Sequence, residues 1–386
     1  MPDRMPSRPV GFYVHYHGRG HRNRTLAILR ELAAYDRPAA VLTSLMADLD
    51  WPANVTHTVD LACDDHHVPP DGLRHRDEMP AAHYAPLHAW TIRRRVHQLA
   101  EWFDAANPAA LVVDVSCEVA TLARLASVPT VLMRQHGDRR DVAHENAYRS
   151  ARRLLAPFPA SMEDDLTPDW VREKTTYAAG FCRYDQPPPP RDAARAQLGW
   201  TSPHVVVMTG RGGDGTDLSG VADAARATPD WTWVVIGMVA DESDPAALPP
   251  NVTLPGWIDD PLPILAGADA VVSAAGHNSV MELAHARART VIIPESRPFA
   301  EQVRKAAILD RDGLAIVRDR WPDAADWPGI LRDASQLDPH RWDPLFDGPG
   351  GAATLAAGIE EVAAESDGID SAAPPSDPIP ATEPPA

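Results

Sequence analysis

The stretch DAVVSAAGHNSVMELAHA covers residues 269–286. It consists of an apolar run, the single glycine Gly276 and the expected start of a helix. The run 269–275 is short and rich in small and β-branched residues, which is typical of a buried strand. Strands that alternate with helices in this way build parallel α/β sheets. The stretch therefore predicts a parallel strand followed by a crossover helix.

The polar residues at this junction indicate a site for an anion. Asn278 and Ser279 are residue types that cap helix N-termini, and Glu282 is expected in the first turn of the helix. The free N–H groups and the helix dipole favour a phosphate there. A carboxylate beside a phosphate can accept hydrogen bonds from ribose hydroxyls, as in other nucleotide sites. An ordinary capped helix with an acidic first turn is the alternative at this point.

The same alternation of strand-like and helix-like segments fills two parts of the chain. It runs from residue 10 to about 160, stops at YDQPPPPRD (184–192), and restarts beyond it. Four consecutive prolines can continue neither a helix nor a central strand. We predict an α/β protein of two Rossmann-like domains that face each other across a cleft. The predicted parts are an N-terminal domain 1–183, a Pro-rich linker 184–192, a C-terminal domain 193–345, a closing helix 346–366 and a disordered acidic tail 367–386.

Length and charge limit the classes of function. A chain of 386 residues is too long for one ordinary core. The net charge of −18 argues against nucleic acid and anionic membrane as bulk partners. The sequence has neither an apolar run long enough to span a membrane nor a signal-peptide core, so we expect a cytoplasmic protein. Arg93, Arg94 and Arg95 lie on an expected helix. They either belong to a solvated helix face or make peripheral contact with the inner face of a membrane.

Metal sites are not expected. The three cysteines have no paired spacing, which argues against disulfides and a cysteine zinc site. Several histidines lie in residues 62–90, but their spacing fits no compact zinc site, and we interpret the segment as an acceptor-binding loop. The D-x-D match at Asp48–Asp50 is interpreted as a loop rather than as a metal site.

Ligands of open α/β sheets bind beyond the carboxyl ends of the strands. The segment HGRGHRNR (17–24) follows the first apolar run and contains Gly18, Gly20, His21 and Arg24. Glycines let the backbone approach a ligand. A helix N-terminus tends to keep a nearby imidazole neutral, which suits His21 to act as a general base. A polar loop residue is the alternative for His21.

Three further segments after strands carry candidate residues. Asp114 could orient a histidine, or could equally cap the helix that begins near Glu118. The segment 209–215 contains a G-x-G-x-x-G match that favours a loop touching a phosphate or sugar, with an NAD site as the alternative. Glu301 and Gln302 can hydrogen-bond hydroxyl groups, although a solvated helix start is the default for them.

Together these motifs resemble the GT-B fold glycosyltransferases. The resemblance is closest to glycosyltransferase family 28, which includes the bacterial enzyme that adds N-acetylglucosamine to lipid-linked peptidoglycan precursors, and the UDP-glycosyltransferases are also similar. GRGHRNR (18–24) resembles the N-terminal G-x-G-H-x-x-R loop of the family. Residues 256–307 resemble its donor-binding signature, and the whole resemblance covers residues 10–345.

The resemblance implies inverting, metal-independent transfer of a hexosyl group from a UDP-sugar to a hydroxyl of a small-molecule or lipid-linked acceptor. No cofactor is implied beyond this nucleotide-sugar donor. The implied catalytic pair is His21 with Asp114. The implied donor-binding residues are Gly210, Arg211, Gly212, Ile258, Gly276, His277, Asn278, Ser279, Glu282, Glu301 and Gln302, and those on the acceptor side are Gly18, Gly20 and Arg24. A sugar-nucleotide 2-epimerase, a sugar-nucleotide hydrolase and a non-catalytic nucleotide-sugar-binding protein are the alternatives on this scaffold.

Overall fold

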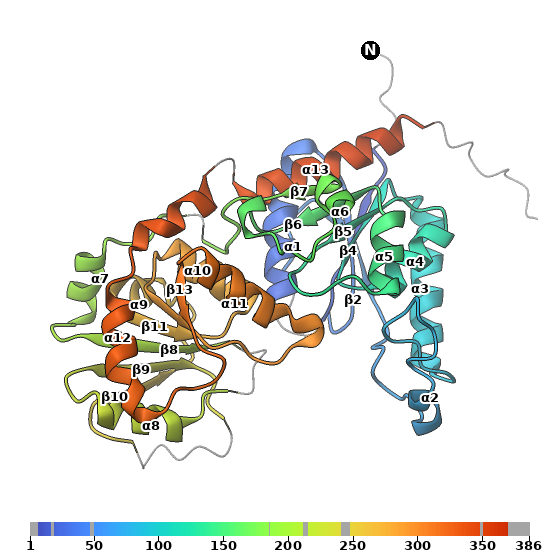
Figure 1. The fold of residues 1–386 in the computed structure, drawn as a ribbon. Helices are drawn as coiled ribbons and strands as arrows, with labels where there is room; N and C mark the ends of the chain where they lie inside the picture. The colour runs from blue at the N-terminus through green and yellow to red at the C-terminus, as the bar shows by residue number, and fades with distance from the viewer. Residues whose placement is uncertain are drawn as a thin grey trace, which may run out of the picture.

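The computed structural model describes residues 7–16, 19–46, 50–184, 186–210, 215–240, 248–347 and 350–369. Within them the chain forms two α/β units, each built on one parallel sheet (Figure 1). The predicted fold class, two Rossmann-like domains, is confirmed. Gly18, Arg211, Gly212 and residues 370–386 of the predicted tail lie outside the described residues.

The first unit has a seven-stranded sheet in the order β3-β2-β1-β4-β5-β6-β7. Its strands are β1 (Val10–Tyr13), β2 (Ala39–Thr43), β3 (Val55–Asp60), β4 (Ala110–Asp114), β5 (Thr130–Met133), β6 (Arg153–Ala156) and β7 (Thr175–Tyr177). Its helices are α1 (Arg19–Leu32), α2 (Pro70–Arg74), α3 (Trp90–Ala106), α4 (Cys117–Leu125), α5 (Val142–Ser150) and α6 (Asp169–Glu173), with 3-10 turns η1 (Ala33–Tyr35) and η2 (Ala160–Met162).

The second unit has a six-stranded sheet in the order β10-β9-β8-β11-β12-β13. Its strands are β8 (His204–Thr209), β9 (Thr232–Gly237), β10 (Val252–Gly256), β11 (Ala270–Ser273), β12 (Thr290–Ile292) and β13 (Ala315–Val317). Its helices are α7 (Arg191–Leu198), α8 (Leu218–Ala227), α9 (Leu262–Gly267), α10 (His277–His285), α11 (Glu301–Arg311) and α12 (Trp327–Ser335), with 3-10 turns η4 (Pro298–Ala300), η5 (Ala324–Asp326) and η6 (Pro339–Phe346). The described residues 184 and 186–190 of the predicted linker lie between β7 and α7, whereas its last two residues, Arg191 and Asp192, already begin α7.

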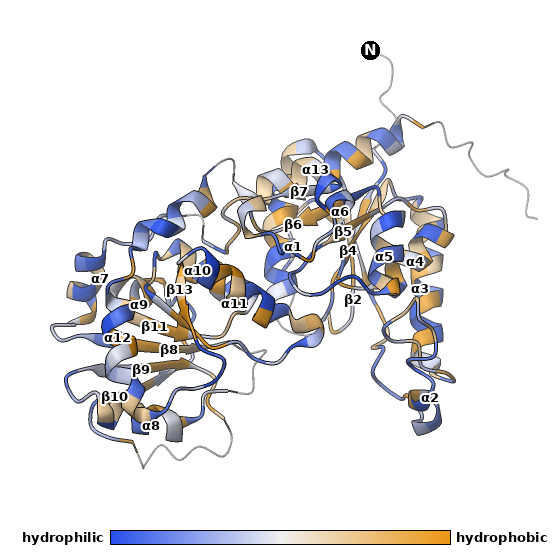
Figure 2. Cartoon of the chain, viewed as in Figure 1, coloured by the Kyte–Doolittle hydropathy of each residue, from blue (hydrophilic) through white to orange (hydrophobic). Residues whose placement is uncertain are grey.

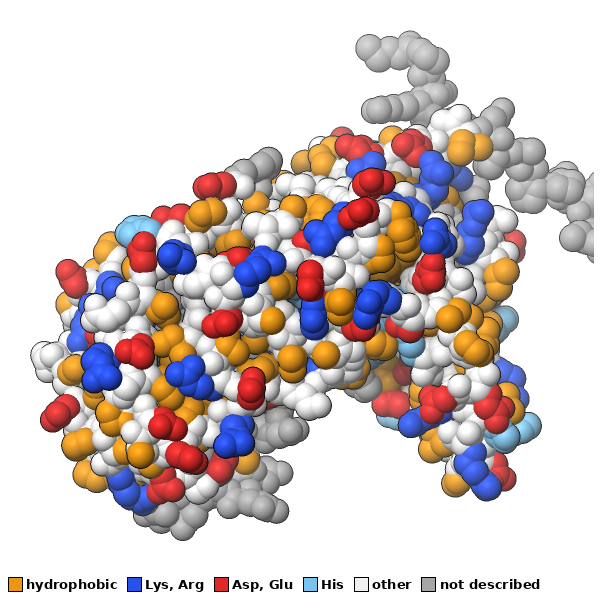
Figure 3. Space-filling view, viewed as in Figure 1, with side chains coloured by type: hydrophobic (Ala, Val, Ile, Leu, Met, Phe, Trp, Pro, Cys, Tyr) orange, Lys and Arg blue, Asp and Glu red, His pale blue; other side chains and the backbone are white. Residues whose placement is uncertain are grey.

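Central strands are buried on both faces, which explains their continuous apolar runs. Every residue of β2 and of β4 is buried. In the first unit one core cluster joins the sheet to α1, and another joins it to α3, α4 and α5. Figure 2 shows the strands as the apolar centre of each unit, whereas the helices carry mixed hydropathy. On the face drawn in Figure 3, acidic and basic side chains are interspersed over both units.

The strand orders place one topological switch point in each sheet. In the first sheet β1 lies between β2 and β4, and in the second β8 lies between β9 and β11. The crevice beyond the carboxyl ends of strands at such a point is where open α/β sheets bind ligands. The loops after β1 and β4, and those after β8 and β11, are therefore the places where a ligand site is expected.

The last helix, α13 (Gly351–Asp367), returns to the first unit. It packs against α1, and Leu355, Ile359 and Val362 join the same core cluster as α1 (Figure 1). The helix begins five residues later than the predicted closing helix at 346–366, after η6. It also includes Asp367, which we had placed in the tail. Among the described residues no helix is long and apolar enough to cross a membrane.

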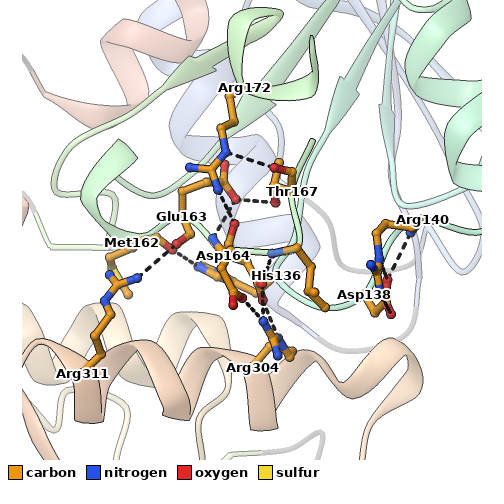
Figure 4. Close-up of polar contacts among 12 residues, drawn as sticks. His136, Asp138, Arg140, Met162, Glu163, Asp164, Thr167, Arg172, Arg304 and Arg311 are labelled. Carbon is orange, nitrogen blue, oxygen red and sulfur yellow. Dashed lines mark hydrogen bonds and ion pairs between the residues drawn. The ribbon is translucent and has the colours of Figure 1, made fainter. Parts of the chain in front are cut away.

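Contacts from α11 and from the turn before it tie the second unit to the first (Figure 4). The Arg304 guanidinium donates from Nε to Oδ2 of the nearly buried Asp164 at 2.8 Å. The Arg311 Nη2 atom donates to the Ser161 carbonyl at 2.8 Å. The backbone N–H of Asp138 donates to the Phe299 carbonyl at 2.7 Å. The two units therefore meet along α11, whose N-terminal end carries Glu301 and Gln302.

Candidate active site in the cleft between the two units

A cavity of about 640 Å³ opens between the two units, a size that suits a small-molecule ligand. It lies at the switch points of both sheets. It brings together the following predicted residues from both halves of the chain: Gly20, His21, Arg24, Gly210, Ile258, Gly276, His277, Asn278, Ser279, Glu282, Glu301 and Gln302. The predicted partner of His21, Asp114, lies behind His21 rather than in the cavity wall.

His21 and Asp114 form a close pair at the first switch point. His21 lies in the first turn of α1, and its Nδ1 atom is 2.7 Å from Oδ2 of Asp114. The other carboxylate oxygen accepts from Nη2 of Arg24 at 2.6 Å. Burial alone would raise the pKa of Asp114, but the Arg24 and His21 side chains hold it well below its usual range. An ionised Asp114 favours the imidazole tautomer with its proton on Nδ1, which leaves Nε2 able to accept a proton.

Asp114 is not the cap of the following helix, which was the alternative for this residue. Ser116 caps α4 instead, because its hydroxyl accepts from the Val119 backbone N–H at 3.2 Å. The carboxylate of Asp114 is thus free of a capping role and is committed to His21 and Arg24.

The start of α10 differs from the prediction by two residues. Gly276 occupies the cap position in an extended conformation, with no side-chain cap, so Asn278 and Ser279 lie in the first turn and do not cap the helix. Glu282 consequently lies in the second turn, and we had placed it in the first. The reason is that the chain already turns into the helix at Gly276. The first N–H groups of α10 have no side-chain cap beside the cavity, which is the arrangement that binds anions.

Glu282 is held at the cavity by an arginine that the sequence interpretation missed. Nε of Arg183 lies 2.9 Å from Oε1 of Glu282, whose side chain is 14% exposed. Burial raises the pKa of Glu282, and Arg183 opposes this rise. Arg183 precedes the proline-rich linker and lines the same cavity. Arg183 lies shortly after β7, so the rule that ligands bind beyond strand ends could have found it. The sequence interpretation did not predict β7 and therefore missed this arginine.

Gln302 joins two loops of the second unit. Its side-chain Oε1 accepts from the backbone N–H groups of Ala275 at 3.0 Å and Glu295 at 2.9 Å. Its Nε2 atom donates to the Glu295 carboxylate at 3.1 Å. Gln302 therefore fixes the loop before α10 relative to the loop before α11, in addition to lining the cavity.

Other cavity residues also went unpredicted. Gln135 follows β5 and Glu295 follows β12, so the rule that ligands lie beyond strand ends could have found both. The remaining polar or aromatic lining residues without a predicted role are Arg22, Asn23, Thr209, Trp257, Asp259, Ser273 and Arg297.

Two histidines of the segment 62–90 belong to clusters of residues that could hold a metal ion: His66 lies with Cys63 and Asp65, and His83 lies with Cys117 and His144. Potential ligand atoms of His83, Cys117 and His144 lie within 4.8 Å of one another, which the sequence spacing had not indicated. Asp141 contacts both imidazoles, at 2.8 Å to His83 Nε2 and 2.5 Å to His144 Nδ1. Arg139 Nη1 lies 3.0 Å from the remaining nitrogen of His144, and this cation opposes a metal ion there.

Comparison with known proteins shows a likeness to glycosyltransferases over part of the second unit. Residues 240–320 match the family model described as the glycosyltransferase family 28 C-terminal domain. Two proteins described as uncharacterized glycosyltransferases, from Methanosarcina acetivorans and Methanosarcina mazei, are each 30% identical to this chain over 95 and 94 residues. The match covers 24% of this chain and 24% and 25% of theirs, so it spans about a quarter of the curated relatives' length.

Solved structures share the fold over nearly the whole chain. The glycotransferase of kitacinnamycin is 18% identical, with a TM-score of 0.65 over 92% of this chain and 99% of its own. MurG of Acinetobacter baumannii is 15% identical, with a TM-score of 0.63 over 92% and 100%. The calicheamicin glycosyltransferase CalG4 is 19% identical, with a TM-score of 0.63 over 93% and 98%. The predicted GT-B fold and the resemblance to family 28 glycosyltransferases are confirmed.

Proposed function

We propose that the protein transfers a hexosyl group from a UDP-sugar to an acceptor hydroxyl, with inversion and without a metal ion. One observation carries the proposal: a single cavity is lined by the uncapped N-terminus of α10, by the largely buried carboxylate of Glu282 and by His21, which pairs with Asp114 behind it. The family 28 match over residues 240–320 supports a nucleotide-sugar donor. The acceptor is a small or lipid-linked molecule that enters from the first unit.

The donor binds mainly to the second unit. Its diphosphate lies at the N-terminus of α10, beside Gly276 and Ser279, where the helix dipole and free N–H groups offset the negative charge. The ribose hydroxyls donate to Glu282, and uracil lies against the backbone at Ile258. The sugar lies beside Glu301 and Gln302, at the end of α11 that abuts the first unit.

The chemical step is a direct displacement at the anomeric carbon. Nε2 of His21 takes the proton of the acceptor hydroxyl while its oxygen forms a bond to that carbon. The bond from the carbon to the β-phosphate oxygen breaks, and UDP leaves with the electron pair. The N-terminus of α10 stabilises the charge that develops on UDP, and Asp114 stabilises the imidazolium of His21.

Glu282→Ala is expected to weaken UDP binding by about ten- to a hundredfold, because hydrogen bonds to a charged carboxylate contribute roughly 1.5–3 kcal/mol. The variant also leaves Arg183 without its partner at 2.9 Å. Calorimetric titration with UDP measures the change, and Glu361→Ala, which removes an exposed carboxylate of α13, is the matched control. Equal affinity in wild type and Glu282→Ala contradicts the ribose assignment.

Chelation of divalent metal is expected to leave turnover unchanged within about twofold, because a helix N-terminus offsets the diphosphate charge. The measurement compares initial rates in EDTA with rates in excess Mg²⁺, at a fixed concentration of donor and acceptor. Activity that EDTA abolishes and Mg²⁺ restores contradicts the proposed mechanism.

The donor and the reaction class are tested together. A panel of UDP-sugars is screened for thermal stabilisation, since a ligand that binds only the folded state raises its stability by mass action. The best donor is then incubated with the protein alone. A new sugar-nucleotide isomer indicates a 2-epimerase, and free sugar with UDP indicates a hydrolase. A transferase leaves the donor intact until an acceptor is added.

A further inference from the structure

The aromatic ring of Phe299 reaches from η4 of the second unit into a polar cage on the first. Its centroid lies 4.9 Å from the ring centroid of His83 and 4.7 Å from that of His144. The guanidinium carbon of Arg139 lies over the ring, 4.5 Å from the same centroid. Aromatic pairs and cation–π contacts are attractive at these distances. The cage, His83, Arg139 and His144, comes from the loop between α2 and α3, the loop after β5, and α5.

Hydrogen bonds within the first unit hold the cage together. The Asp141 carboxylate contacts both imidazoles, at 2.8 Å to His83 Nε2 and 2.5 Å to His144 Nδ1. Nη2 of Arg139 donates to Oε1 of Gln135 at 3.1 Å, and Gln135 lines the cleft cavity. The cage is therefore held by contacts that do not involve Phe299, and it continues into the wall of the cavity.

The backbone at Phe299 has a conformation that its own residue types do not favour. Phe299 and Ala300 have φ angles of 59° and 53°, in the left-handed region that residues other than glycine rarely occupy. Such a turn persists only where surrounding structure holds it. The first unit supplies this support, because the Asp138 N–H donates to the Phe299 carbonyl at 2.7 Å. A Cβ atom at Gly137 would lie 2.6 Å from the same oxygen, so glycine is needed for this close approach.

Glu301 follows the left-handed turn directly. It is the first residue of α11 and lines the cavity together with Gln302. Gln302 is fixed within the second unit, through the backbone N–H groups of Ala275 and Glu295. The backbone just before Glu301 is instead held by the first unit. The place of Glu301 in the cavity therefore depends on how Phe299 docks in the cage.

We propose that Phe299 is a positioning residue: its docking in the cage of the first unit holds the left-handed turn and thereby places the Glu301 carboxylate to bind hydroxyls of the donor sugar. The first unit then takes part in recognition of the sugar, although the donor binds mainly to the second. The effect on the sugar rests on the proposed function, whereas the docking of Phe299 does not.

Docking is tested first, without ligand, by hydrogen exchange of the Asp138 amide in the full chain, followed by NMR. This amide should be protected in the wild type, because it donates to the Phe299 carbonyl. Phe299→Leu keeps an apolar side chain but removes the ring, and should speed the exchange at least about tenfold. Phe299→Tyr keeps the ring and should keep the protection. An unprotected Asp138 amide in the wild type overturns the docking, as does unchanged exchange in folded Phe299→Leu.

Phe346→Leu is the matched control. Phe346 is also a half-buried residue of the second unit, and its ring lies 5.6 Å from that of His285, outside the residues that line the cavity. The control should leave the exchange of Asp138 unchanged. If it speeds this exchange as much as Phe299→Leu does, the role assigned to the Phe299 ring is overturned.

Calorimetry with UDP and with the best UDP-sugar of the thermal screen gives the second readout. Phe299→Leu should bind UDP within about twofold of the wild type, but should bind the UDP-sugar at least about tenfold more weakly, because the hydrogen bond from the sugar to a charged carboxylate is lost. A general weakening of the fold would instead lower both affinities together. Equal losses for the two ligands, or wild-type affinity for both, overturn the positioning role. If the wild type binds neither ligand, the proposed function fails, and the exchange measurement still decides the docking of Phe299.

Discussion

His21→Ala is expected to lower turnover by about 10²–10⁴, the usual cost of removing a positioned general base. UDP affinity should stay nearly intact, because in the proposed function the nucleotide binds to the second unit, whereas His21 lies on α1 of the first. Steady-state kinetics beside UDP titration separates the two effects once an acceptor is known. His57→Ala, an exposed histidine on edge strand β3, is the matched control.

Asp114→Asn tests the orienting role of the carboxylate. Turnover should fall less than in His21→Ala, because the base itself remains. Stability should fall too, since the buried Arg24 loses its ion pair at 2.6 Å. Near-normal turnover in His21→Ala, or loss of UDP binding together with activity, rejects His21 as the base.

Glu163→Gln is expected to destabilise the fold by about 3–5 kcal/mol, because it leaves the Arg134 guanidinium buried without its charge partner. The two groups are 4% and 3% exposed, at 2.7 Å. Glu163 also accepts from the hydroxyl of Thr167 at 2.8 Å (Figure 4). Chemical denaturation measures the change, with exposed Glu173→Gln as the control. Equal denaturation midpoints in wild type and Glu163→Gln contradict the expectation.

The ion pair of Glu163 with Arg134 also predicts that the folded state loses stability in acid. Burial would raise the pKa of Glu163, but Arg134 and the hydroxyl donors lower it to about 2, from an ordinary value near 4.5. Its contribution is fully present above the unfolded value and is lost as pH falls towards 2. Stability of the wild type should therefore drop more steeply over this range than that of Glu163→Gln. The loss of this ion pair in acid is also expected to affect the cleft between the units, because the adjacent Asp164 accepts a hydrogen bond from Arg304 of α11.

Most of the strands could be predicted, because central strands of a parallel sheet are buried on both faces and read as apolar runs. The edge strands β3 and β7 could not. The residues of β3 are intermediate or exposed, and those of β7 are all half-buried, so neither shows that pattern. The cap of α10 was misplaced because residue type favours Asn278 and Ser279, whereas the backbone already turns at Gly276. The prediction used the capping preferences of single residues, whereas the start of the helix is decided by the backbone geometry of the turn between β11 and α10.

The sequence by itself determined the two parallel sheets and which loops carry polar residues after strands, since both follow from local patterns of apolar runs, glycines and prolines. Only the tertiary structure decided which of these residues meet. It brought His21 to Asp114 across 93 positions and Arg183 to Glu282 across 99. It also returned α13 to the first unit. These pairings depend on strand order and on the docking of α11, which are set by long-range packing and buried ion pairs.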